Sequence, residues 1–149
     1  MMIDGGSRFV VLSCGGLRLA FPLKFVLKVE EWHRPEPLPG GKDWILGINP
    51  GESTVNPVVL QSFWGKEGAP AEVFLLLDFK GTRLGIPGAA PAIIDGMPRK
   101  IENRESPHDC LDWFIMESEN AAWCVNVPRL YRTLNLEYDG RDNIGGQDG

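Results

Sequence analysis

The sequence has few histidines and cysteines, which are common in catalytic and metal sites. Its two histidines, His33 and His108, lie in stretches rich in Pro and Asp, and its three cysteines include no close pair. His108-Asp109-Cys110 is the one local cluster, and it lacks the Cys-x-x-Cys or His-x-x-x-His spacing with which one turn supplies two zinc ligands. No phosphate-binding loop is present either. We therefore expect a protein that is not an enzyme and has no cofactor and no metal.

Long apolar runs and clusters of basic residues are also missing. No apolar run approaches the roughly 18 residues that a membrane span needs, and the N-terminal MMIDGGSR does not have the pattern of a signal peptide. With 15 Lys and Arg against 20 Asp and Glu, the formal net charge is −5. This balance argues against a nucleic-acid groove and against binding to an anionic membrane. Three unpaired cysteines fit a reducing compartment, so we expect a cytoplasmic protein without nucleic-acid binding or membrane insertion.

What the sequence does contain is a repeated stretch. Phe9 to Pro22, FVVLSCGGLRLAFP, returns at Phe74 to Pro87 as FLLLDFKGTRLGIP, at a constant offset of 65 residues. Both copies pass through a Gly turn and end at a Pro, as one strand–turn–strand unit used twice would. Any β-hairpin with a Gly turn would share part of this pattern, but hairpin chemistry does not require the repeated Arg. A period of about 65 residues is too long for a solenoid and suits one small β-barrel per copy. The identities are Phe9/Phe74, Leu12/Leu77, Gly16/Gly81, Arg18/Arg83, Leu19/Leu84 and Pro22/Pro87.

Most of the remaining chain has the pattern of short strands separated by Gly and Pro turns. Gly88 to Pro91 (GAAP) is expected to interrupt the strands of the second copy. Near the end, Pro128 stands where a first helical turn would begin, and Leu130 and Leu134 are four apart, which predicts one short helix. The prediction is an all-β fold with one short C-terminal helix. The expected strands are Arg8–Cys14, Leu17–Phe21, Val26–Trp32, Trp44–Ile48, Thr54–Leu60, Val73–Phe79, Thr82–Pro87, Ala92–Met97, Trp113–Met116 and Ala122–Val127.

The order of these pieces resembles the CheW-like coupling proteins of bacterial chemosensory arrays, over roughly Arg8 to Leu134. None of the similar segments is a catalytic signature, so the resemblance is diffuse but long and correctly spaced. The segments that carry it are Phe21-Pro22-Leu23-Lys24-Phe25-Val26, similar to the family's Leu-Pro-Ile-x-x-Val step; Pro37-Leu38-Pro39-Gly40 followed by Trp44-Ile45-Leu46-Gly47-Ile48; Val55-Asn56-Pro57-Val58-Val59-Leu60; and Val127-Pro128-Arg129-Leu130 at the start of the terminal helix.

The resemblance implies two SH3-like, five-stranded β-barrel lobes around a shared core. Within a CheW-like domain spanning residues 8–136, we expect the lobes at roughly 15–65 and 72–127, with exchange of strands between them left open. Residues 1–7 are expected to be flexible, and the Gly- and Asp-rich residues 137–149 to be disordered.

The resemblance also implies a non-enzymatic scaffold in chemotaxis, a branch of two-component signal transduction. Members of the CheW-like family bind the regulatory domain of a chemotaxis histidine kinase and the cytoplasmic tip of a chemoreceptor. From the residues alone, Trp32 is a candidate contact anchor, because it follows two glutamates and precedes His-Arg-Pro. The expected protein-binding residues are Val29, Glu31, Trp32, Asn49, Glu52 and Ser53.

This sequence departs from the family at its most recognisable loop. The family's Asn-Leu-Arg-Gly falls on Pro50 to Ser53, so that Glu52 replaces an Arg. If Glu52 lies near Glu31, the two repel by about a few tenths of a kcal/mol instead of pairing. Two alternatives stay open. The chain could be an interaction module of the same fold with a different partner, such as a capping or competing subunit, or an enzyme or small-ligand protein that uses the inter-lobe cleft around His108 or Cys110.

Overall fold

The structure is a computed structural model that describes residues 8–36, 45–50, 55–59, 61–64, 70–100, 108–117, 120–134 and 136. Residues 1–7 and 137–149, for which flexibility was predicted, lie outside this part of the chain. Strands dominate the described residues, and the prediction of an all-β fold with one short C-terminal helix is confirmed. In chain order the elements are β1 (Arg8–Cys14), β2 (Leu17–Pro22), the 3-10 helix η1 (Leu23–Phe25), β3 (Val26–Glu31), β4 (Ile45–Pro50), β5 (Val55–Val59), the 3-10 helix η2 (Gln61–Trp64), β6 (Val73–Phe79), β7 (Thr82–Asp95), β8 (Arg99–Lys100), β9 (Leu111–Glu117), β10 (Asn120–Val125) and α1 (Val127–Thr133).

The repeated stretch forms the same hairpin twice. The register of β1 with β2 reappears in β6 with β7, pair by pair, at the offset of 65 residues seen in the sequence. The matching pairs run from Phe9↔Pro22 to Cys14↔Leu17 in the first hairpin and from Phe74↔Pro87 to Phe79↔Thr82 in the second, whose ladder extends by one further pair, Val73↔Gly88.

The turns of the two hairpins match as well. Gly15 and Gly16 have φ of 53° and 82°, and Lys80 and Gly81 have φ of 55° and 85°. Two successive positive φ angles define the type I′ turn, whose twist suits a two-residue hairpin. In the second turn the Asp78 carboxylate accepts a hydrogen bond from the Gly81 N–H at 3.0 Å. The glycines predicted to make the turns are therefore at the positions that need them.

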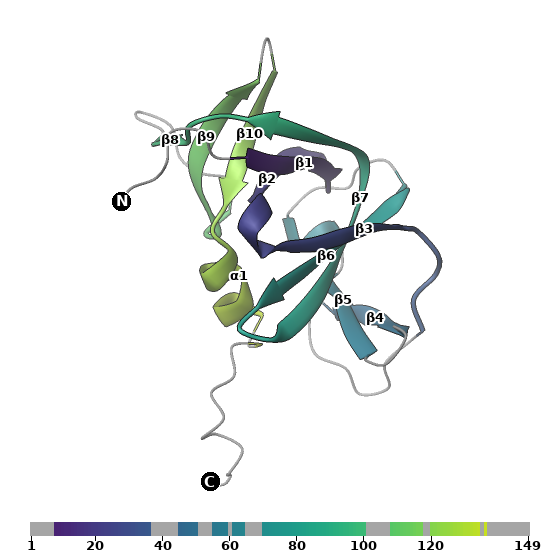
Figure 1. The fold of residues 1–149 in the computed structure, drawn as a ribbon. Coiled ribbons are helices and arrows are strands. Elements are labelled where there is room, and N and C mark those ends of the chain that lie inside the picture. Colours follow the sequence, from purple (N-terminus) through teal and green to yellow (C-terminus); the bar gives the residue numbers. More distant parts are fainter. Residues whose placement is uncertain are drawn as a thin grey trace, which may run out of the picture.

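Strands are exchanged between the two copies. β3 follows the first hairpin but pairs with β6 of the second, and the far half of β7 pairs with β1 of the first. Parallel pairs complete each group, because β5 joins β7 at Val58↔Gly85 and β10 joins β2 at Cys124↔Ala20. The two groups are β3–β6–β7–β5–β4 and β7–β1–β2–β10–β9, which share β7 (Figure 1). They form the predicted pair of SH3-like barrels; the lobe boundaries at 15–65 and 72–127 stay a prediction.

One hydrophobic core joins both groups of strands. Leu12 and Leu19 of the first hairpin and their counterparts Leu77 and Leu84 of the second are all fully buried in it. A smaller cluster, which includes Phe9, lies among residues of β1, β2 and β10. Since successive side chains of a strand point to opposite faces, β1 is covered on both faces, as its nearly continuous apolar sequence predicts.

The expected interruption at Gly88 to Pro91 is wrong, because β7 runs without a break from Thr82 to Asp95. The strand passes from β6 to β1 within this stretch: Gly88 pairs with Val73, and Ala89 pairs with Ser13. Ala90 takes a φ of +53°, and its N–H donates to the Glu72 carboxylate at 3.2 Å. The Gly and Pro residues therefore bend a continuous strand instead of ending it, as they do at bulges.

The start of α1 is fixed by hydrogen bonds from its capping residue and from its first turn. Asn126 Oδ1 accepts a hydrogen bond from the Arg129 N–H at 3.0 Å, which caps the helix, and Pro128 occupies its first turn as predicted. Arg129 Nη1 and Asn126 Nδ2 both donate to the Asp112 carboxylate, at 2.7 and 2.8 Å. Asp112 lies on β9, so the helix is tied to the strand group that it follows.

Candidate protein-binding surface

The candidate surface is centred on β3, which lies at one end of the strand order (Figure 1). Its apolar and charged residues come in the alternation that predicts a strand, and Pro22 and the short helix η1 set it off from the first hairpin. It pairs antiparallel with β6, from Val26↔Leu77 to Glu31↔Val73, with an irregularity between Val26 and Lys28. Among the residues that the structure describes, β3 pairs with β6 alone.

Two large apolar side chains of β3 are exposed. Leu27 is 44% and Val29 is 42% accessible to solvent, and Leu23 on η1 adds a third at 37%. Single exposed apolar residues are common on protein surfaces. Two on an edge strand, with a third on the short helix that precedes it, are consistent with a surface that a partner covers.

Charged side chains accompany these apolar residues. Lys28 Nζ lies 2.9 Å from Glu30 Oε2, which puts both side chains on the same face of the strand. Lys24 lies over the ring of Phe25, with 5.2 Å from Nζ to the ring centroid. Glu31 at the end of the strand is exposed. The edge strand therefore carries exposed apolar residues and, on the opposite face from Val29, two opposite charges that are two residues apart.

Trp32, expected to be a partly exposed anchor, is half-buried at the end of β3. Its ring lies 4.7 Å from that of the buried Phe74, measured between centroids, and its N–H donates to the Glu72 carbonyl at 3.1 Å. The ring of His33 contacts Phe74 as well, edge to face at 5.3 Å. Trp32 therefore has part of its surface free for a partner while the rest is held in place by packing.

The six predicted binding residues are only partly brought together in the described residues. Val29 and Glu31 share β3, and Trp32 follows them directly. Asn49 lies on β4, where its backbone pairs with Asn56. Glu52 and Ser53 lie outside the described residues, so their proximity to Glu31 stays a prediction.

Sequence reasoning missed Leu27 and two exposed apolar residues near the end of β7. These are Ile93, which is 65% accessible, and Met97, which is 53% accessible. Val29 opposes Leu75, and Ile93 opposes Val10, the residue 65 positions before Leu75. Val29 and Ile93 are therefore equivalent positions in the two copies, and both are exposed and apolar. Val29 alternates with the charged Lys28 and Glu30, but Ile93 lies between Ala92 and Ile94, so the equivalence of the two positions can be seen only once the strand exchange is known.

The His108–Cys110 cluster, the candidate for a small-ligand site, is built as a packing contact. The His108 ring lies 4.5 Å from that of Phe63 and 5.3 Å from that of Trp64 on η2, between centroids. Its Nδ1 accepts a hydrogen bond from the Cys110 N–H at 3.1 Å. Burial lowers the pKa of His108, against the opposing effects of Asp109 and of a hydrogen bond with the Phe63 backbone. Burial also raises the pKa of Cys110, which favours the protonated thiol over the thiolate.

Two further findings concern only the described residues. They contain no group of three or more His, Cys, Asp and Glu side chains arranged to hold a metal ion. None of their helices combines the length and the apolar character that crossing a membrane requires.

Comparison with known proteins shows what fold this is. No protein-family model matches the sequence, and a search of curated proteins finds no match. Among solved structures, the scaffolding protein TtCheW from Thermoanaerobacter tengcongensis superposes with a TM-score of 0.70 at 12% sequence identity. The match covers 80% of this chain and 88% of that chain. The chain therefore has the CheW fold, and the resemblance seen in the sequence is confirmed at the level of fold.

Proposed function

From a fold shared with a CheW scaffolding protein, we propose that this chain is a divergent CheW-like scaffold in bacterial chemosensory signalling. In this role it is a cytoplasmic, non-enzymatic adaptor that couples the cytoplasmic tip of a chemoreceptor to the regulatory domain of a chemotaxis histidine kinase. The observation that carries the proposal is the exposed strip of Leu27 and Val29 on edge strand β3, within a CheW fold. An apolar strip on a sheet edge suits contact with another folded domain.

The contact is expected to use β3 together with the end of β4. Val29 and Leu27 supply the apolar area, Glu31 the charge beside it, and Trp32 a rigid aromatic edge whose position is fixed by Phe74. Asn49, Glu52 and Ser53 complete the surface in the proposal. Residues that are buried in the centre of an interface contribute most of its affinity, and rim charges mainly set its specificity.

The test is binding to the kinase regulatory domain encoded in the same genome, measured by isothermal titration calorimetry. We expect a complex with a Kd of roughly tens of micromolar or tighter. Val29→Asp should weaken it at least about tenfold, because it places a charge in the apolar strip. Arg8→Glu, an exposed change at the far end of β1, is the matched control and should leave the affinity unchanged. No binding of the unmodified chain at roughly tens of micromolar would contradict the proposal.

Replacing Glu52 by Arg tests the altered loop separately. If Glu52 lies beside Glu31, Glu52→Arg converts a repulsion into an ion pair and strengthens binding to the receptor tip by up to about fivefold. An unchanged or weaker affinity would mean that the two residues are not neighbours. If neither the kinase domain nor the receptor tip binds, the Glu52 departure favours the second candidate function, an interaction module of this fold with another protein partner.

A further inference from the structure

The free edge of β3 presents specific backbone groups. The Trp32 N–H donates to the Glu72 carbonyl, which precedes β6, so residue 32 turns its backbone toward the sheet. Backbone direction alternates along a strand, so the backbone groups of Glu30 and Lys28 also face β6. Those of Val29 and Glu31 face outward. Within the described part of the chain, no strand pairs with them.

Such an edge is a template for another strand unless something blocks it. Proteins usually protect edges with Pro, with isolated charges or with a covering loop. β3 contains no Pro, and its centre is the exposed Val29 beside the exposed Leu27. Its two opposite charges, on Lys28 and Glu30, lie on either side of Val29 in the sequence. In an antiparallel pair of two β3 strands, the Lys of one copy can therefore oppose the Glu of the other.

Only a few registers are possible when β3 meets β3 of a second copy. In an antiparallel pair, outward-facing residues must oppose outward-facing residues, so a two-fold axis passes through one residue of each strand. Centring the pair on Lys28 or on Glu30 sets like charges directly opposite each other, which is destabilising. Centring it on Val29 sets Lys28 of each copy opposite Glu30 of the other.

We propose that a second copy of this chain is the partner of the β3 edge, in an antiparallel dimer centred on Val29. The two Val29 residues exchange both of their outward hydrogen bonds, and Lys28 and Glu30 form two ion pairs between the copies. Leu27 lies diagonal to Val29 of the second copy, within reach of an apolar contact. One sheet then continues from β6 of one copy, through the two β3 strands, to β6 of the other copy. This proposal stands on the edge and its charge pattern; because it uses the strip that the proposed function assigns to the kinase domain, the dimer and the kinase complex would compete for β3.

The dimer predicts a specific exchange of charges. Sedimentation velocity of the full chain should show concentration-dependent dimers, formed between about 10 µM and 1 mM. Lys28→Glu sets Glu opposite Glu, and Glu30→Lys sets Lys opposite Lys, so each variant alone should raise the dissociation constant by about tenfold or more. In an equimolar mixture of the two variants, both facing pairs of the mixed dimer combine a glutamate of one chain with a lysine of the other, so the dimer should return.

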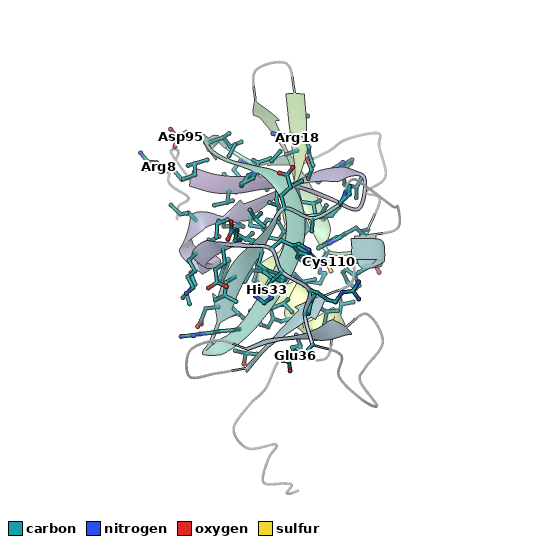
Figure 2. The ribbon with its side chains drawn as sticks, turned by 90° about the vertical axis from the view of Figure 1, so that its right-hand side faces the viewer. Arg8, Arg18, His33, Glu36, Asp95 and Cys110 are labelled. Carbon is teal, nitrogen blue, oxygen red and sulfur yellow. The ribbon has the colours of Figure 1, made fainter. Side chains whose placement is uncertain are left out.

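General attraction between the two variants cannot explain such a recovery. Each reversal changes the formal net charge by two units from −5, downward for Lys28→Glu and upward for Glu30→Lys, and both chains remain negative. Recovery in the mixture therefore reports the local pairing. Arg8 and Asp95 form another exposed ion pair, at 3.1 Å, and lie together at one side of the molecule (Figure 2). Reversing Arg8 to Glu is the control and should leave the dimer unchanged.

Val29→Pro tests the hydrogen bonds. Proline removes the outward N–H of residue 29, while the bonds that Lys28 and Glu30 direct toward β6 remain. We expect a folded monomer, as judged by near-ultraviolet circular dichroism and by sedimentation. A wild-type chain that stays monomeric to about 1 mM would overturn the proposal. So would a mixture of Lys28→Glu and Glu30→Lys that fails to associate, and this mixture decides the question even if the proline variant does not fold.

Discussion

Gly88 is the residue on which the crossing of β7 depends. A Cβ atom at this position would lie 2.5 Å from Leu12 Cγ and 2.8 Å from the Ser13 carbonyl oxygen. Both distances are well inside van der Waals contact, and one of the two partners is backbone, which cannot move aside as the end of a long side chain can. Gly88 is therefore needed for space, because β1 passes directly against it.

Gly88→Ala should lower the free energy of unfolding by about 1–3 kcal/mol or more, since overpacking forces the backbone to shift. Urea denaturation followed by tryptophan fluorescence measures this change. Gly81→Ala is the matched comparison, because Gly81 has a φ of +85° but no atom of the described residues within 4 Å of an added Cβ. That variant suffers backbone strain without collision and should cost about 1–2 kcal/mol. A Gly88→Ala protein as stable as the original would contradict the tight approach of β1.

The two glycines also differ in what a sequence can say about them. Gly81 stands in a two-residue turn between alternating strands, and its role follows from local chemistry. Gly88 stands next to two alanines and a proline, which locally indicate a loop. Its neighbour Leu12 is remote in the sequence, so the reason for a glycine there appears only when the strands are paired.

At the scale of elements, His108 joins η2 to the start of β9. Its ring packs against Phe63 and Trp64 while Nδ1 accepts the N–H of Cys110. Protonation of Nδ1 would remove this acceptor and bring a charge among aromatic rings. Burial lowers the pKa of His108 below its ordinary value of about 6.5, which means that the folded state favours the neutral ring.

The contacts of His108 with η2 and β9 predict that the protein loses stability in acid. His108 has a lower pKa in the folded state than in the unfolded state, so its contribution is complete above about pH 6.5 and is lost as the pH falls through the folded-state pKa. His108→Asn keeps an oxygen acceptor for the Cys110 N–H but does not titrate. The difference in unfolding free energy between about pH 7 and pH 5 should therefore be smaller in the variant. His33→Asn retains His108 and should behave as the unmodified chain; equal acid sensitivity in all three proteins would contradict the role of His108.

The elements themselves could be predicted to different extents. Arg8 to Cys14 and Val73 to Phe79 were predicted with the bounds that the structure has, because a nearly continuous apolar run leads directly into a Gly turn. β7 was divided in two, since GAAP has the composition of a loop. What keeps that strand continuous is its pairing, first with β6 and then with β1, together with the Glu72 carboxylate that accepts the Ala90 N–H. Those partners are supplied by tertiary structure.

For the whole molecule, the sequence repeat predicted two equivalent units but left open the exchange of strands between them. Exchange depends on which neighbour β3 finds after η1, and both copies offer a strand of the same kind. The candidate surface was predicted in the same partial way. Trp32 follows from local pattern and Val29 and Glu31 from the resemblance to the CheW-like proteins, while the exposure of Leu27 and Ile93 depends on the exchanged pairing.

The same exchange means that the two strand groups must hold together as one body, and α1 contributes to this directly. It follows β10 in one group and contacts the second hairpin, which belongs to the other. Tyr131 Oη donates to the Thr82 carbonyl at 2.7 Å, and the Tyr131 ring lies 5.3 Å from that of Phe79, between centroids. Burial raises the pKa of the Tyr131 hydroxyl, so the proton that it donates is retained throughout the physiological range.

Tyr131→Phe removes the hydroxyl, with its hydrogen bond to the Thr82 carbonyl, and keeps the ring contact with Phe79. The Thr82 carbonyl then loses the Tyr131 donor in a partly buried position, and we expect the free energy of unfolding to fall by about 0.5–1.5 kcal/mol. For a chain of this size, that corresponds to a decrease in Tm of about 2–6 °C. Hydrogen exchange gives a second readout, because amides at the end of α1 should exchange faster if the helix depends on the hairpin. Unchanged exchange in α1, even with a lower Tm, would mean that the helix is held by its own strand group and that Tyr131 stabilises the hairpin alone.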